Sequence, residues 1–163
     1  MTIHEKMYDE KSYVPKEKPK VMVSGGFDPV HAGHIRMIRD AANFGDVIVV
    51  ANSDDWLFRK KGFVFMTFEQ RAEILNAIKG VILVDSVNDS DGTVCEAIRR
   101  LKPDFFANGG DRGRTNTPEV DVCKELNIEL IDYFEKEIPN IFSKKKDIDV
   151  AFSILELMKR RDE

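Results

Sequence analysis

The sequence predicts an α/β fold in which a five-stranded parallel sheet lies between two layers of helices. From Val21 onward, short apolar runs alternate with longer amphipathic stretches. The apolar runs have hydrophobic residues at consecutive positions, which indicates strands that are buried on both faces. Alternation of such strands with helices is typical of a three-layer α/β/α domain. The length of 163 residues fits one such domain.

The five strands are expected where the apolar runs lie. The first two are short valine-rich runs, and the third has the sequence Val-Ile-Leu-Val. A Lys-Pro-Asp turn leads into the fourth, and the fifth follows the last central helix. These strands are predicted at residues 21–23, 47–50, 81–84, 103–107 and 128–131.

The helices are placed by their start signals. Thr67 and Gln70 have the spacing of a capping box, and Thr117 followed by Pro118 is typical of an N-cap with proline at the first helical position. Helices are therefore predicted after the first loop to about residue 43, and at residues 67–79, 91–101, 117–126 and 147–160. The mostly polar residues 1–19 are expected to form a mobile N-terminal extension, and residues 20–163 the domain. The segment 52–61 is expected to be a loop.

Composition excludes several classes of function. The formal net charge is -4, from 25 basic and 29 acidic residues. This balance argues against nucleic acid as a partner, which needs a basic face. No apolar run is long enough to span a bilayer and no signal peptide is visible, so we expect no membrane partner and a cytoplasmic location. Cys95 and Cys123 are expected to be buried or half-buried thiols, and no metal site is predicted.

The loop after the first strand carries the strongest functional signal. Ligands of open parallel sheets bind at the carboxyl ends of the strands. Residues 25–34 there read Gly-Gly-Phe-Asp-Pro-Val-His-Ala-Gly-His. His31 and His34 are three residues apart at a helix start, so both imidazoles face the same side. Gly25 and Gly26 fit a tight turn, and Gly33 allows a ligand to approach the backbone.

Two histidines at a helix N-terminus suit a phosphate under nucleophilic attack. The transition state spreads negative charge over the phosphoryl oxygens, and preorganised donors stabilise that charge. An attacking substrate phosphate is already ionised at pH 7 and needs no general base. A metal site at His31 and His34 is a weaker interpretation, because no third ligand follows at suitable spacing.

This motif resembles the His-x-Gly-His signature of the cytidylyltransferase-like nucleotidyltransferases. The resemblance implies a Rossmann-like domain, a nucleoside triphosphate bound with Mg²⁺, and in-line transfer. It implies catalytic roles for His31 and His34. It also implies nucleotide contacts in the same loop, for which we select Gly25, Gly26, Phe27 and Gly33.

Basic residues after the second strand form the second part of the predicted site. In the related cytidylyltransferases, lysines at this place contact phosphates and a Glu-Gln-Arg run follows at the next helix start. This chain has Lys60, Lys61 and then Glu-Gln-Arg at residues 69–71. The resemblance therefore implies that Lys60, Lys61 and Arg71 bind the triphosphate, with Lys61 expected to be catalytic. The alternative is a solvated basic loop.

A glycine pair after the fourth strand is the third part. Gly109 and Gly110 allow a flat base to lie on the backbone, and Asp111 offers an acceptor to a ribose or base. The stretch resembles a Lys-Pro-Asp…Gly-Gly-Asp segment of heptose-1-phosphate adenylyltransferases. Arg112 stands where related families carry an aromatic residue. The alternative is a plain turn with an aspartate cap.

The last family motif is the least complete. Relatives have a Ser/Thr-rich turn that donates to the β- and γ-phosphates, and here only Ser143 keeps a hydroxyl, followed by three lysines at residues 144–146. Either the lysines replace the missing donors, or this segment has lost the contact. We select Ser143 as a nucleotide-binding residue on the resemblance.

The sequence thus predicts a nucleotidyltransferase that moves NMP from an NTP to a sugar- or polyol-phosphate and releases pyrophosphate. ATP is favoured as donor and CTP comes next. The alternatives are a non-catalytic nucleotide-binding protein of the same fold and an assembly subunit. We expect a homodimer. Four side chains between the second strand and Thr67 are interpreted as core or dimer surface rather than as an acceptor site: Trp56, Phe63, Phe65 and Met66.

Overall fold

The computed structural model describes residues 17–109 and 117–133, together with Glu156. Its sheet has five strands in the order β3-β2-β1-β4-β5, and all four neighbouring pairs are parallel. The strands are β1 (Lys20–Gly25), β2 (Asp46–Ala51), β3 (Val81–Asp85), β4 (Phe105–Gly109) and β5 (Glu129–Tyr133). The helices are α2 (Ala32–Ala41), α3 (Asp54–Lys61), α4 (Phe68–Asn76), α5 (Cys95–Leu101) and α6 (Pro118–Glu125).

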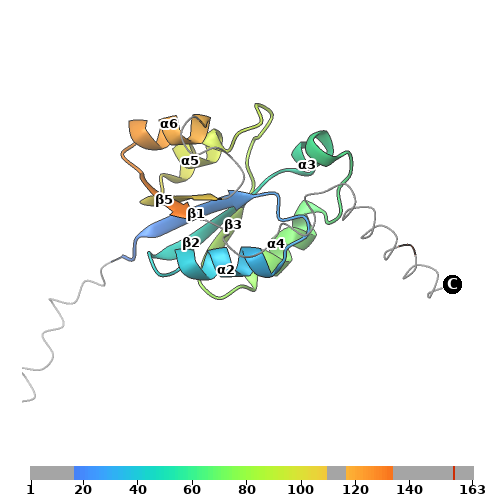
Figure 1. The fold of residues 1–163 in the computed structure, drawn as a ribbon, viewed down its shortest axis with the longest axis horizontal. Coiled ribbons are helices and arrows are strands. Elements are labelled where there is room, and N and C mark those ends of the chain that lie inside the picture. Colours follow the sequence, from blue (N-terminus) through green and yellow to red (C-terminus); the bar gives the residue numbers. More distant parts are fainter. Residues whose placement is uncertain (1–16, 110–116, 134–155, 157–163) are drawn as a thin grey trace, which may run out of the picture.

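Helices cover both faces of the sheet, so the predicted α/β fold class is confirmed (Figure 1). One hydrophobic cluster joins the strands to α2 and α4, and the other joins them to α5 and α6. Within β1, Val21 and Val23 belong to the first cluster and Met22 to the second. This alternation of side chains along a strand explains why every position of the run is apolar.

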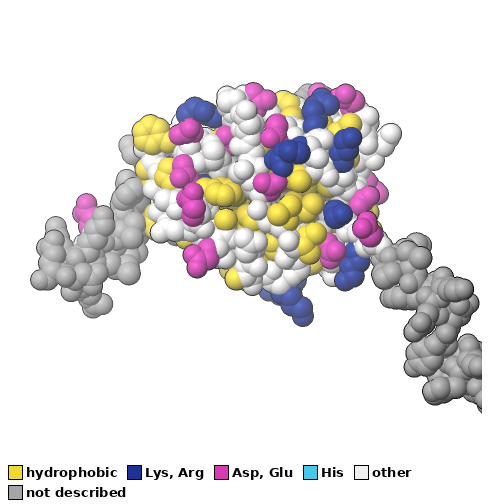
Figure 2. Space-filling view, turned by 180° about the vertical axis from the view of Figure 1, so that it is seen from behind, with side chains coloured by type: hydrophobic (Ala, Val, Ile, Leu, Met, Phe, Trp, Pro, Cys, Tyr) yellow, Lys and Arg dark blue, Asp and Glu magenta, His cyan; other side chains and the backbone are white. Residues whose placement is uncertain are grey.

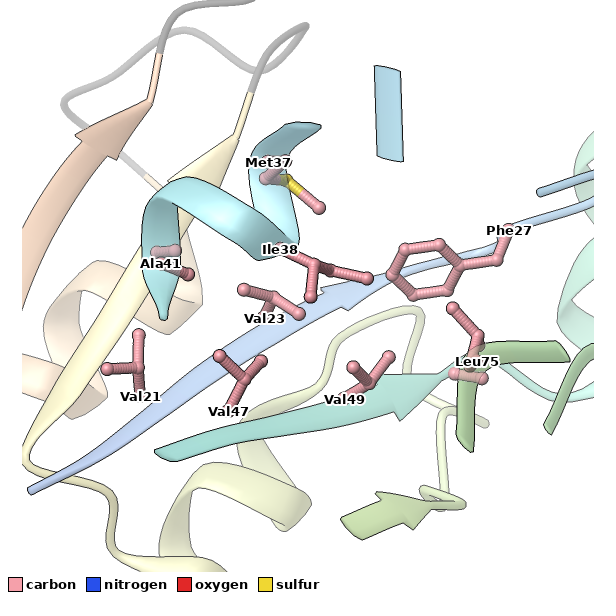
Figure 3. Packing of buried hydrophobic residues seen from close by; sticks show 11 residues of the cluster. Val21, Val23, Phe27, Met37, Ile38, Ala41, Val47, Val49 and Leu75 are labelled. Carbon is pink, nitrogen blue, oxygen red and sulfur yellow. The ribbon is translucent and has the colours of Figure 1, made fainter. Parts of the chain in front are cut away.

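The first cluster extends to the end of β1 that carries the predicted site. Figure 3 shows Ile38 of α2 above Val23 and Val47, with the Phe27 ring farther along the row towards Leu75. The Phe27 side chain is only 2% exposed. The core therefore reaches under the loop after β1 and supports it from below.

Chain topology places that loop at the switch point of the sheet. From β1 the chain continues to β2 on one side, whereas β4 pairs with β1 on the other. The loop after β1 therefore leaves the sheet where the strand order reverses, which is where ligands bind in open α/β sheets.

Several predicted boundaries are confirmed and others shift. Thr67 caps α4 with the predicted Gln70 capping box, and Thr117 precedes α6 with proline at its start. The helix predicted from residue 91 begins only at Cys95, because Asp91 Oδ1 accepts the Thr93 N–H and hydroxyl and so closes a turn. The predicted helix 147–160 lies outside the described residues except for Glu156, as does most of the predicted extension 1–19.

The loop prediction for residues 52–61 is wrong, because this segment contains α3. Ser53 caps the helix by accepting the Trp56 N–H, and Gly62 ends it with a left-handed backbone at φ 85°. Acidic Asp54 and Asp55 stand in the first turn and three cations in the last. A Ser-Asp-Asp start and a Lys-Lys-Gly end are ordinary helix signals, which the apolar-run pattern hid.

The described surface mixes charges and apolar side chains. Figure 2 shows basic and acidic side chains interspersed on one face, with hydrophobic side chains gathered towards its middle. Cys123 is buried, Cys95 is partly buried and neither forms a disulfide, as the sequence predicts. Burial raises the pKa of the Cys123 thiol to about 11. Within the part of the chain that is described, no helix has the length and apolar character required to cross a bilayer.

Candidate functional site

The candidate site begins with His31, which caps α2. Its backbone is extended, and its Nδ1 accepts the N–H of Gly33 at 3.0 Å. In return, Nδ1 of His34 accepts the backbone N–H of His31 at 3.1 Å. Two histidines thereby form a reciprocal capping box, which normally needs a hydroxyl and a longer amide or carboxylate.

The capping box brings the two imidazoles together. Their ring centroids are 3.8 Å apart and the planes differ by 25°, so the rings stack. The Phe27 ring meets His34 edge-on at 4.9 Å. The expectation from the three-residue spacing, that both rings share one face, is confirmed.

These contacts fix the tautomer of each neutral ring. An imidazole nitrogen that accepts an N–H cannot carry a proton, so the proton of the neutral ring must lie on Nε2. Burial, followed by the proximity of His31, lowers the pKa of His34 to about 3. His34 is therefore a neutral Nε2–H donor at pH 7, and the donor role needs no protonation.

The structure gives the residues around the histidines roles in packing and capping, and their predicted nucleotide contacts stay predictions. The Phe27 side chain is buried in the core and supports His34. The N–H of Gly33 is used by His31. A Cβ on Gly26 would lie 2.9 Å from Leu57 of α3, whereas one on Gly25 would meet the Phe27 ring at 3.4 Å. Close packing is therefore sufficient to explain Gly26.

The three cations at the end of α3 point to different partners. Arg59 donates to the carbonyl of Asp89 at 2.8 Å, and the Lys60 Nζ lies 4.7 Å from the centre of the Trp56 ring. Lys61 reaches the loop after β1, where its Nζ lies 2.7 Å from a carboxylate oxygen of Asp28. Successive helical residues are turned by about 100°, which directs the three side chains to different sides of the helix. Among their described contacts, those of Lys61 reach the histidine loop.

Asp28 is a site residue that the sequence analysis missed. Its side chain is 0% exposed, and it also accepts the backbone N–H groups of Phe65 at 2.8 Å and Met66 at 2.6 Å. It therefore ties the histidine loop to α3 and to the segment before α4. Its place inside the Gly-Gly-Phe-Asp run was the available signal, but its partners lie 33 to 38 positions away.

Arg71 requires a correction, because the structure gives it no surface for a phosphate. Its side chain is 0% exposed. It donates to the carbonyls of Gly26, Asn52 and Met66 and to a carboxylate oxygen of Asp54, at 2.7 to 3.0 Å. Four of the five guanidinium N–H groups are used in this way. Direct triphosphate binding does not fit this geometry, and Arg71 instead braces the loops after β1 and β2.

A second buried carboxylate anchors the start of α3. Asp89 is 3% exposed and accepts the Asn52 side-chain amide at 3.1 Å. It also accepts the backbone N–H of Ser53 at 2.8 Å and its hydroxyl at 2.6 Å. Asp89 resembles Asp28 in burial and in the number of donors, but its described donors are a side-chain amide, a backbone N–H and a hydroxyl rather than a cation. The two carboxylates together hold both ends of α3.

The structure describes only one of the remaining predicted site residues. Gly109 ends β4, next to β1 at the switch point. Gly110, Asp111 and Ser143 lie outside the described residues, so their predicted contacts stay predictions. Within the described ranges, no group of three or more His, Cys, Asp or Glu side chains is arranged to hold a metal ion.

Comparison with known proteins gives relatives over the same region. The model of the cytidylyltransferase-like family matches residues 22–161. A bifunctional protein HldE from Sulfurimonas denitrificans is 34% identical over 128 residues, which are 77% of this chain and 26% of that protein. An FAD synthase from Thermococcus kodakarensis is 36% identical over 101 residues, which are 60% of this chain and 66% of that protein.

A solved structure agrees at the level of the fold. The crystal structure of a lipopolysaccharide core biosynthesis protein from Thermoplasma volcanium has a TM-score of 0.59 and 21% identity. The match covers 70% of this chain and 94% of that one. The chain thus spans nearly the whole of this neighbour, but only about a quarter of the HldE relative.

Proposed function

Because the chain belongs to the cytidylyltransferase-like family of nucleotidyltransferases, we propose that it transfers NMP from an NTP to a sugar- or polyol-phosphate. The acceptor phosphate attacks the α-phosphorus, the bond to the β-phosphate oxygen breaks, and pyrophosphate leaves. The proposal rests on one observation above all, the stacked and mutually capped pair of His31 and His34.

The pair is suited to stabilise the charge that develops in this reaction. Both imidazoles are fixed by backbone hydrogen bonds before any ligand arrives, so little reorganisation is needed. The helix that they cap adds a positive dipole end at the same place. Neutral Nε2–H donors at a helix start favour a phosphoryl group without requiring a change of protonation.

Lys61 supplies the cation that we propose for the triphosphate. Its Nζ is held beside the histidine loop, and its side chain is 17% exposed. Lys60 is exposed on the same helix and serves, in this proposal, as a weaker and outer contact. Arg71 is not included, because it is enclosed by carbonyl groups.

The relatives support ATP as the donor. FAD consists of FMN joined to AMP, so the named product of the Thermococcus kodakarensis relative contains an adenylyl group on a ribityl phosphate. A ribityl phosphate is a polyol phosphate, the acceptor class proposed here. The Lys-Pro-Asp run at residues 102–104 adds the resemblance to heptose-1-phosphate adenylyltransferases. CTP remains the second candidate donor.

Mg²⁺ is proposed to arrive with the nucleotide. Asp28 does not fit a metal ligand, because its buried oxygens already face two N–H groups and an ammonium. Asp54 is the partly exposed carboxylate near the loop after β2, and it is paired with Arg71. Phosphate oxygens and water are ordinary ligands of Mg²⁺ and would hold it here. When bound, it would neutralise charge on the β- and γ-phosphates.

A pyrophosphate-release screen tests the activity. Four NTPs are combined with a panel of sugar phosphates, polyol phosphates and FMN, with Mg²⁺ present, and a His31→Asn, His34→Asn double variant is the matched control. Release by the wild type with one acceptor, and its loss in the control, supports the proposal. Binding of an NTP without release would favour the non-catalytic alternative. Neither binding nor release would favour an assembly subunit.

We further propose that two copies associate through the outer edge of β3, in a cytoplasmic enzyme. β3 is an end strand of the sheet, and Ile82 and Leu83 are 53% and 39% exposed on it. Ile74 of the neighbouring α4 is also exposed. An apolar edge strand with unpaired backbone groups favours pairing with another strand, and a second copy supplies an identical one.

A further inference from the structure

We propose that Asp28 is a positioning residue of the transfer site, whose buried carboxylate aims the ammonium group of Lys61 at the triphosphate. The inference rests on the proposed function in one respect, that Lys61 contacts the phosphates. It goes beyond that function by naming the group that makes a flexible lysine a preorganised donor.

Asp28 contacts both Lys61 and the segment that follows α3. Lys61 Nζ donates to the Asp28 carboxylate at 2.7 Å and to its backbone carbonyl at 2.8 Å. Phe65 and Met66 donate their backbone N–H groups to the two carboxylate oxygens. One residue of the histidine loop therefore fixes both the end of α3 and the segment that follows it.

The charge of the buried Asp28 side chain requires an explanation other than stability. Moving an ion pair out of water costs about as much as the pair returns, so a buried salt bridge is weak evidence for a stabilising role. An apolar residue would leave the N–H groups of Phe65 and Met66 without an acceptor, but the oxygen of a neutral amide has two lone pairs for them. A carboxylate at 0% exposure with an ammonium partner is therefore better explained by the geometry that it imposes on Lys61.

The Lys61 ammonium group has more hydrogen-bond donors than Asp28 uses. An ammonium group has three N–H donors, and the described contacts direct two of them to Asp28. The Phe63 ring lies 4.8 Å from Nζ and limits its movement. Among the described residues, hydrogen bonds account for two of the three donors, so the third is available to a phosphate oxygen. A lysine with a four-carbon stem gains most from such fixation.

Two features of the chain provide matched controls. Lys60 is the neighbour of Lys61 on α3 and is exposed over Trp56, so it serves as an internal reference for amine reactivity. Asp89 is the other buried carboxylate that anchors α3, with N–H and O–H donors only among its described partners. Loss of its charge should weaken the fold without changing the environment of the Lys61 ammonium.

A double-mutant cycle on the full chain tests the proposal through kinetics. Asp28→Asn should lower kcat by about 10- to 100-fold, since small misplacements of a catalytic group have effects of this size. Lys61→Met should lower it at least as much, and the double variant should be no worse than Lys61→Met alone. Asp28→Glu keeps the charge and should recover part of the loss. Asp89→Asn should change kcat by less than about threefold while lowering the melting temperature.

Amine labelling tests the same point without any activity. Acetic anhydride is reacted with the folded protein, and mass spectrometry gives the labelling rate of Lys61 relative to Lys60. The ratio should rise about tenfold in Asp28→Asn, as expected for a lost charge-assisted hydrogen bond, and stay near the wild-type value in Asp89→Asn. If Asp28→Asn does not fold, Asp28→Glu takes its place and should keep Lys61 protected.

The kinetic and labelling experiments distinguish failure of the proposed function from failure of the positioning role. If the wild type releases no pyrophosphate with any substrate pair, the proposed function fails, and the labelling ratio still decides whether Asp28 holds Lys61. Additive effects of the two substitutions on kcat would overturn the positioning role. An unchanged labelling ratio in Asp28→Asn, or an unprotected Lys61 in Asp28→Glu, would also overturn it.

Discussion

The backbone N–H of His31 donates to Nδ1 of His34 while the His31 ring caps the helix that carries His34. Each histidine therefore holds the other in place, and neither ring can turn without breaking a backbone hydrogen bond. A substitution at one position must affect the orientation of the other as well as its own chemistry.

We predict that His34→Ala lowers kcat by about 10² to 10³, the cost of losing one preorganised transition-state donor. His31→Ala should do the same and also weaken the start of α2 by about 1 kcal/mol through loss of the cap. His31→Asn keeps a capping side chain without the imidazole. It should therefore retain wild-type stability in urea unfolding and still lose activity in pyrophosphate release. A wild-type kcat in His31→Asn would show that the His31 imidazole has no catalytic role.

The pKa of His34 predicts how stability depends on pH. The pKa is about 3 in the folded protein and about 6.5 in an unfolded chain, so the unfolded state binds more protons between these values. Stability from this residue is complete above pH 6.5 and falls as the pH is lowered towards 3. The loss at pH 5 should be at most about 2 kcal/mol.

Carboxylates titrate in the same window, so the comparison is with His34→Gln. Urea unfolding at pH 7, 6, 5 and 4 should show a steeper fall in the unfolding free energy for the wild type than for the variant. Parallel curves for the two proteins would mean that the His34 ring is not held neutral by its surroundings.

The fold could be predicted from sequence further than the site could. Apolar runs identify parallel strands, and the three-residue spacing of His31 and His34 brings the rings together because local helix geometry fixes it. Apart from Met66, which is five positions from Arg71, the partners of Asp28 and Arg71 are set by tertiary packing over 17 to 45 positions, which no local pattern contains. The position of Arg71 in a family motif therefore suggested a phosphate contact, whereas its burial indicates that it holds the loops after β1 and β2 together.

We predict that Arg71 acts on stability rather than on nucleotide affinity. Arg71→Lys keeps the charge but loses the planar fork, so at least one of the carbonyl groups of Gly26, Asn52 and Met66 loses its donor. The unfolding free energy should fall by about 3 kcal/mol or more. Asp54→Asn, which removes only the partly exposed partner, should cost less.

Nucleotide titration of the folded variants gives the second readout for Arg71. The KM for NTP of Arg71→Lys should stay within about threefold of the wild type at a temperature where both are folded, whereas Lys61→Met should raise KM or lower kcat in its folded form. A stable Arg71→Lys with a strongly raised KM would restore the direct phosphate contact.

The edge strand gives the last prediction. Sedimentation equilibrium of the full chain should show a dimer, because Ile82 and Leu83 expose apolar area on the strand that ends the described sheet. Leu83→Lys places a charge on that edge and should shift the protein to a monomer while its melting temperature changes little, since the side chain is already partly exposed. Phe58→Lys on α3 is the matched control, because Phe58 is 62% exposed but lies on a different element. If the dimer persists in Leu83→Lys and dissociates in Phe58→Lys, the contact lies on α3 instead. A wild type that is monomeric at every concentration would contradict the proposed dimer.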